Sequence, residues 1–159
     1  MDLRSQMTRI NIKQFVDEYM SAIPLDLFIA LQDKLINGQT HTTLLTAIVE
    51  AVQAKSNEIK REEIAMKKCT NLNNLGIQQE KLGNIDYAIK LYEENINSTF
   101  IACHSFDRLM ILYRQKKEYN NEIRVINKAL DVLCKRYPQL KDKYLKRLEN
   151  AKQLKNKNK

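Results

Sequence analysis

The chain has 159 residues, of which only three are glycine and two are proline, while 29% are charged. Residues that lose little side-chain freedom in a helix are abundant, so the composition predicts a single all-helical domain. No apolar run approaches the ~20 residues that a membrane span needs, and we therefore expect a cytoplasmic protein without membrane contact.

The few cysteines and histidines argue against metal, disulfide or catalytic chemistry. Cys69, Cys103 and Cys134 lie more than 30 residues apart, without the close pairs of zinc sites or redox motifs, and are expected as buried thiols. Cys103 and His104 are adjacent, and neighbouring helical side chains point about 100° apart, so they cannot work as nucleophile and base. With no phosphate-binding loop either, we predict neither an enzyme nor a cofactor.

Two short amphipathic helices are predicted near the N-terminus. Apolar residues recur at helical spacing from Ile12 to Met20, Pro24 interrupts the pattern, and a second stripe ends shortly before Gly38. The two helices should form a hairpin that either completes the core or serves as a dimerisation or docking element. Its large apolar residues include Phe15, Tyr19, Leu27, Phe28 and Leu31.

A polar segment leads into a third predicted helix, over residues 43–54. Thr42 or Thr43 can cap this helix, because a threonine hydroxyl accepts from the free backbone N–H groups of a first turn. Two alternatives remain beyond residue 54: the helix continues unbroken through 57–67, or it ends and another begins. In either case the N-terminal helices occupy residues 8–67.

Apolar residues repeat with a period of 34 in the rest of the chain. A period of this length predicts stacked pairs of helices, because each pair has an apolar face that it cannot bury alone. The residues in register are Leu72, Phe106 and Leu140; Leu75 and Leu109; Gly76, Met110 and Tyr144; Tyr92 and Ile126; and Ile96 and Leu130.

Residues 69–102 resemble one unit of the tetratricopeptide repeat (TPR) family. Leu75 and Gly76 stand at the Leu-Gly pair of that repeat, and the turn glycine, the small residue of the second helix and its aromatic residue are matched by Gly83, Ala88 and Tyr92. Glycine suits a left-handed helix end, and small residues let helix backbones approach closely. The resemblance implies a right-handed superhelix of helical hairpins.

Residues 103–136 are a second, less regular unit of the same kind. Met110, Lys117 and Glu122 stand where the family has a small residue, the turn glycine and an alanine. After Pro138, a helix over 139–154 is expected to cap the stack, and residues 155–159 are expected to be disordered.

The resemblance also implies a function, which is binding of a peptide or protein segment in the groove lined by the first helix of each unit. Asn74 and Arg108 could hold an anionic or polar group there, since a guanidinium presents a fork to carboxylates, or they could pair with local side chains. The residues expected to face this groove are Asn73, Asn74, Ile77, His104, Asp107, Arg108, Ile111 and Arg114.

The formal net charge of +8 leaves nucleic-acid binding as an alternative. Residues 139–159 hold eight basic and two acidic residues, so the charge gathers at the C-terminus. Tyr144 is the only aromatic residue there, which speaks against base stacking, and solubility also explains the lysines. The residues of this alternative are Lys141, Lys143, Lys146, Arg147, Lys152 and Lys155.

Overall fold

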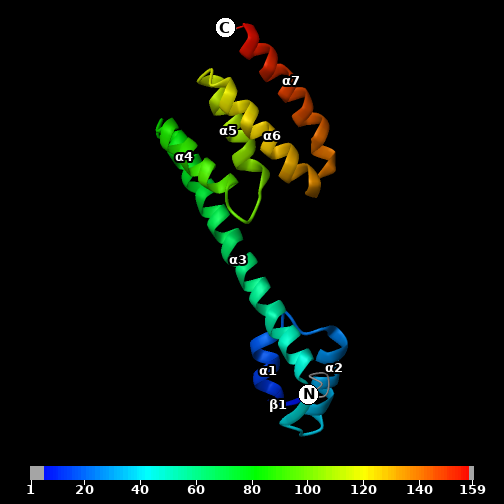
Figure 1. Ribbon diagram of the computed structural model, residues 1–159. Coiled ribbons are helices and arrows are strands. Elements are labelled where there is room, and N and C mark those ends of the chain that lie inside the picture. Colours follow the sequence, from blue (N-terminus) through cyan, green and yellow to red (C-terminus); the bar gives the residue numbers. More distant parts are fainter. Residues whose placement is uncertain (1–5, 158–159) are drawn as a thin grey trace. The chain divides into compact units, whose positions relative to one another are not determined.

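The computed structural model describes residues 6–157 and is mostly helical (Figure 1). The chain divides into two compact units, Met1–Ile64 and Ala65–Lys159, and each has its own hydrophobic core. The predicted helical character is confirmed, whereas the expectation of an all-α chain is wrong because the first unit contains a small sheet. That the chain forms one domain stays a prediction.

The sheet consists of two antiparallel strands, β1 (Met7–Asn11) and β2 (His41–Leu45). Its register pairs Met7 with Leu45 and Asn11 with His41. Thr42 and Thr43 lie inside β2 and cap no helix, since the next helix begins at Thr46. Their β-branched side chains suit the pleated backbone of a strand, which explains why this polar segment is not a loop.

The predicted hairpin of the first unit is confirmed as α1 (Ile12–Tyr19) and α2 (Leu25–Ile36), which pack on each other. The side chain of Asn11 caps α1 by accepting a hydrogen bond from the backbone N–H of Gln14, at 3.0 Å. Gly38 follows α2 with a φ of 78°, the left-handed conformation that glycine adopts without strain.

The apolar residues of this hairpin supply the core of the first unit. Phe15 and Leu31 are buried, and Tyr19, Leu27 and Phe28 are partly buried against the same cluster. These five side chains therefore contribute to the core of the first unit, and a dimerisation or docking role of the hairpin stays a prediction. The buried residues of the cluster are Ile10, Ile12, Phe15, Val16, Leu31, Val49 and Val52.

The third helix, α3, runs without a break from Thr46 to Lys81. Of the two alternatives that the sequence left open, the structure therefore has the continuous helix. Its last residues belong to the second unit, in which they begin the first of the predicted repeats.

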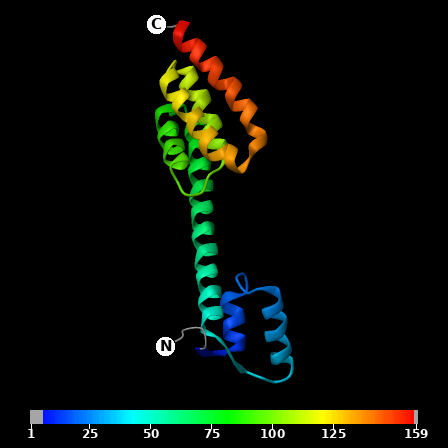
Figure 2. The ribbon, with the colours of Figure 1, turned by 45° about the vertical axis from the view of Figure 1, so that its right-hand side comes forward.

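The second unit stacks its helices in chain order, each against the next (Figure 2). The helix expected over 139–154 runs from Lys141 to Lys157, so the expected disorder is wrong for residues 155–157, while residues 158 and 159 lie outside the described residues. The elements after α3 are α4 (Ile85–Ile96), α5 (Cys103–Gln115), α6 (Tyr119–Arg136), the 3-10 turn η2 (Pro138–Leu140) and α7 (Lys141–Lys157).

Close packing in the second unit centres on Tyr92. Its fully buried ring lies against Gly76, where a Cβ atom would come within 2.6 Å of the tyrosine Cζ. Ala88 is also fully buried, and Gly83 turns the chain between α3 and α4 with a φ of 78°. Leu75 departs from the expected apolar register, since its side chain is 45% exposed.

Lys117 occupies the turn between α5 and α6 and adopts a left-handed backbone, with a φ of 59°. Its N–H donates to the carbonyl of Arg114, and the next N–H, of Glu118, donates to the carbonyl of Tyr113. Lys117 therefore ends α5 with the same left-handed turn that Gly83 makes at the end of α3.

We expect Lys117→Gly to raise the free energy of unfolding by about 0.5 to 1 kcal/mol, because glycine adopts a positive φ without the Cβ clash. Urea unfolding followed by circular dichroism measures this change. Lys116→Gly is the matched control, since Lys116 has a φ of −78° and glycine there should lower stability. Equal effects of the two substitutions would contradict the explanation.

Candidate functional site

The residues predicted to face a groove come from α3 and α5, and contacts across helices bring these two helices and α7 to one surface. Glu80 of α3 pairs with Arg108 of α5, and Asp107 of α5 pairs with Lys143 of α7. We name this surface the α3–α5–α7 face. Its residues are Asn73, Asn74, Ile77, Glu80, His104, Asp107, Arg108, Ile111, Arg114, Lys143 and Arg147.

Arg108 is held within the face by Glu80. Its Nε donates to Glu80 Oε1 at 2.9 Å, and its Nη2 pairs with the other carboxylate oxygen. The hydroxyl of Tyr92 donates to Glu80 Oε1 as well, at 2.7 Å. The local pairing of Arg108, one of the two alternatives drawn from the sequence, is thus the one that the structure has.

These contacts shift two ionisation equilibria. The hydrogen bond from Arg108 lowers the pKa of Glu80 below its ordinary value of 4.5, against the opposing effect of burial. Burial raises the pKa of Tyr92, and its hydrogen bond to Glu80 adds to the shift. At neutral pH Glu80 is therefore a carboxylate and Tyr92 keeps its hydroxyl proton, so the hydrogen bonds between Arg108, Glu80 and Tyr92 persist.

We expect the Glu80–Arg108 pair to stabilise the fold above pH 4.5 and to lose that contribution as the pH falls through the lowered pKa of Glu80. The sign follows because the unfolded chain binds the proton more readily than the folded one. Urea unfolding between about pH 7 and about pH 3 should show a steeper loss of stability for the wild type than for Glu80→Gln. Identical pH profiles would show that this pair contributes nothing.

Asp107 and His104 are engaged in the face as well. Lys143 Nζ donates to Asp107 Oδ2 at 2.8 Å, and the hydroxyl of buried Tyr144 donates to Asp107 Oδ1 at 3.3 Å. The His104 ring lies edge-on to the Tyr92 ring, with 5.8 Å between centroids, and remains exposed. Asp107 therefore fixes α7 on α5, while His104 stays available to a partner.

Asn73 is a partly exposed residue of the face, and its side-chain oxygen takes part in a polar network around the buried Asn95. The Nδ2 atom of Asn95, a residue that is 3% exposed, has two N–H groups for three acceptors within reach: Asn73 Oδ1 at 2.8 Å, Ser105 Oγ at 2.9 Å and the carbonyl of Cys69 at 3.0 Å. The neighbouring Asn74 is exposed, and Ile77 and Ile111 are partly exposed. These three residues and His104 are the accessible part of the predicted groove.

Two arginines of the face, Arg114 from the predicted groove and Arg147 from the nucleic-acid alternative, share one acid, and this pairing was not predicted from the sequence. Glu122 of α6 is fully buried, and its carboxylate lies between Arg114 of α5 and Arg147 of α7. Arg114 Nε donates to Glu122 Oε2 at 3.1 Å, and Arg147 Nε donates to Glu122 Oε1 at 3.2 Å. The signal in the sequence was a glutamate at a position where the resembling repeat has a buried alanine, because a buried carboxylate needs cationic partners.

The basic residues of the nucleic-acid alternative do not form one surface. Lys143 and Arg147 are in ion pairs with carboxylates of α5 and α6. Lys141, Lys152 and Lys155 fall within about 60° of one another around α7, whereas Lys146 projects about 140° away from Lys141. A phosphate backbone laid along that side of α7 would therefore meet three of the six residues.

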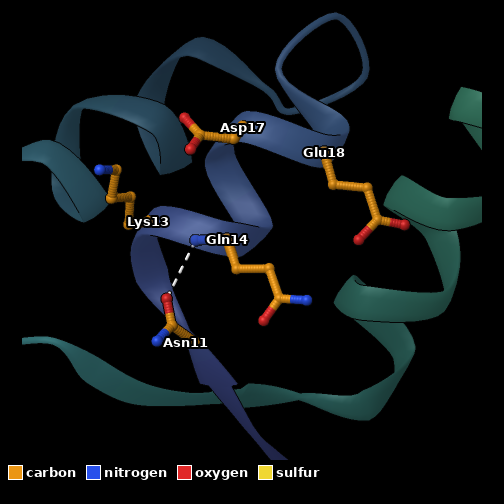
Figure 3. A pocket seen from close by; sticks show the side chains of 5 residues that line it. All are labelled: Asn11, Lys13, Gln14, Asp17 and Glu18. Carbon is orange, nitrogen blue, oxygen red and sulfur yellow. Dashed lines mark hydrogen bonds between the residues drawn. The ribbon is translucent and has the colours of Figure 1, made fainter.

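A shallow polar cavity of about 490 Å³ lies on the first unit, over α1 (Figure 3). Lys13 and Asp17 extend from one side of the helix, and Gln14 and Glu18 extend from the other. Because the side chains diverge, they do not converge on a common ligand atom.

Residues 6–157 offer neither a metal site nor a membrane span. Within them no group of His, Cys, Asp or Glu side chains could hold a metal ion, and no helix is long and apolar enough to cross a bilayer. The three cysteines are free, Cys69 is buried, and burial raises the pKa of the Cys103 thiol. A raised pKa disfavours the reactive thiolate.

The chain was also compared with known proteins. Neither the family models, nor the curated proteins, nor the solved structures gave a match, so the assignment of a function depends on the side chains of the chain and their contacts.

Proposed function

We propose that the chain is a non-catalytic interaction module that binds a peptide or protein segment on the α3–α5–α7 face. The observation that carries the proposal is the set of ion pairs across this face, from Glu80 to Arg108 and from Asp107 to Lys143. These ion pairs hold three helices in a fixed arrangement before a partner binds. The entropic cost of ordering the surface on binding is therefore smaller.

The accessible residues of the face have the chemistry of a protein interface. Asn74 and His104 offer exposed polar groups, and Ile77 and Ile111, about one and two turns further along the same helices, offer partly exposed apolar surface. Apolar contacts rimmed by polar groups are the usual composition of such interfaces. The resemblance to the TPR family, in which the first helices of successive units form the binding groove, supports the same face.

A binding test should use exposed residues of the face, because a change at Arg108 would also leave Glu80 without its partner. We expect the double variant Asn74→Glu and His104→Glu to lose the partner protein in an affinity capture from a nuclease-treated lysate, with retained species identified by mass spectrometry. The two added carboxylates should either repel acidic groups of the partner or lose their hydration water without gaining a counter-charge. A partner that fits the wild type should therefore bind the variant less tightly.

The matched control carries the same two changes elsewhere, Asn127→Glu on α6 and His41→Glu on β2, both at exposed positions. It should retain the partner. Loss of the partner by both double variants, or by neither, would contradict the assignment of the face. Species that disappear only on nuclease treatment would support the nucleic-acid alternative instead.

A second candidate function is self-association through the outer side of α2. Leu25, Ile29 and Ile36 fall within about 40° of one another around this helix and are 73%, 52% and 80% exposed. Exposed apolar stripes of this kind often mark contact surfaces. Sedimentation velocity over a wide concentration range tests it: a dimer that Ile29→Glu dissociates supports the candidate, and a strict monomer rejects it.

A further inference from the structure

The cluster around Glu122 holds more positive than negative charge. Two guanidinium groups, of Arg114 and Arg147, share the one buried carboxylate. Their side chains are 33% and 20% exposed, so both are largely withdrawn from bulk water without being sealed off. A charge that is desolvated without full compensation favours binding of a counter-ion.

The other acids of the face do not balance this surplus. Asp107 is already paired with Lys143, and Glu80 is already paired with Arg108. Glu118, which lies outside the face and directly before α6, accepts from Asn121, and its carboxylate is 3.4 Å from Lys116 Nζ. Each of these carboxylates therefore has its own cation or amide within the described part of the chain.

Both arginines also keep unused hydrogen-bond donors. Arg147 bonds Glu122 through Nε, and within residues 6–157 its Nη atoms have no protein partner. Arg114 Nη2 is buried and belongs to the ion pair, 2.8 Å from Glu122 Oε1, whereas Nη1 of Arg114 has no hydrogen-bond partner within residues 6–157. A guanidinium has five donors, and planar oxyanions match them in pairs.

We propose that Arg114 and Arg147 form a binding site for a carboxylate of the partner segment, with Glu122 as the residue that positions the two guanidinium groups. One carboxylate would cancel the surplus of one positive charge, whereas a dianionic phosphate would reverse it. The inference rests on the proposed function, because it names the chemical group that the α3–α5–α7 face recognises.

The test follows the arginine side chains of the full-length chain directly by NMR. The Nε–Hε signals are recorded at constant ionic strength during titration with three blocked tripeptides. One carries only a glutamate side-chain carboxylate, one carries only a free C-terminal carboxylate, and a neutral glutamine analogue serves as the blank. The first two distinguish the possible sources of the carboxylate in a partner.

We expect saturable shifts of the Arg114 and Arg147 signals with at least one of the two charged tripeptides and none with the neutral one. Arg124 of α6 is the internal control, because it pairs with Glu93 of α4, away from the cluster. Arg147→Gln should weaken the binding about tenfold, and Arg147→Lys should also weaken it, since lysine keeps the charge but loses the fork. Arg124→Gln should change nothing.

The proposal is overturned if neither charged tripeptide gives a saturable shift, if the neutral one gives the same shift, or if both variants at Arg147 keep wild-type affinity. Circular dichroism and urea unfolding of each variant show that it folds. Capture of a partner by the wild type, together with failure of the tripeptides to bind, would leave the proposed function standing and reject the carboxylate site alone.

Discussion

Replacement of Glu122 by alanine should lower the free energy of unfolding by about 3 kcal/mol, although alanine is the residue that the resembling repeat has at this position. The carboxylate is fully buried and receives hydrogen bonds from Arg114 and Arg147. Its removal leaves two guanidinium groups close together without the anion that neutralises them. Urea unfolding at neutral pH measures the loss.

Glu149→Ala is the control for this experiment, because Glu149 is exposed on α7 and its replacement should change stability by less than about 0.5 kcal/mol. A second variant carries Glu122→Ala, Arg114→Leu and Arg147→Leu together. It should recover part of the lost stability, since no charge of the cluster then remains buried. If Glu122→Ala is as stable as Glu149→Ala, the cluster makes no contribution to the fold.

The substitution Gly76→Ala should also destabilise the chain, by about 2 kcal/mol, even though alanine is favoured over glycine in a helix by about 1 kcal/mol. A Cβ atom on residue 76 would come within 2.6 Å of the Cζ atom of Tyr92. The Tyr92 ring is fully buried, and its hydroxyl is fixed on Glu80, so the ring cannot move aside without loss of that hydrogen bond.

Gln78→Ala, at an exposed position on the same helix, should leave stability nearly unchanged or raise it slightly. Tyr92→Leu should cost stability in the wild type by loss of ring packing, and Gly76→Ala should cost less in that background than alone. Additive effects of the two substitutions would show that the contact between residue 76 and the ring is not the cause.

Helix positions could be predicted well from the sequence because the apolar spacing of about 3.6 residues is local information. The hairpin of α1 and α2 and the turns at Gly38 and Gly83 follow from residues a few positions apart, whereas the close approach at Gly76 was expected from the resemblance to the repeat. The strands could not be predicted in the same way. Each of β1 and β2 has five residues, and they pair only because a helical hairpin brings them together.

The candidate site was predicted less completely, for a similar reason. The resemblance to the repeat placed the expected groove residues on the first helix of each unit, but it gave no information on which acids would neutralise which cations. Arg108 and Glu80 are 28 residues apart, and Glu122 and Arg147 are 25 residues apart. The choice of partners depends on how the helices are rotated against each other, which is a property of packing and not of local sequence.

The amide of Asn95 also disfavours other ways of packing α3, α4 and α5 against one another. It connects Asn73 and the carbonyl of Cys69 on α3 with Ser105 on α5, inside an otherwise apolar layer. If α4 slid or rotated by one residue, the Asn95 amide would be buried without its acceptors, at a cost of about 1 to 3 kcal/mol, while Asn73 and Ser105 would keep the hydrogen bond between them. Apolar side chains tolerate many competing arrangements, and the need to satisfy this amide disfavours those in which α3, α4 and α5 are misaligned.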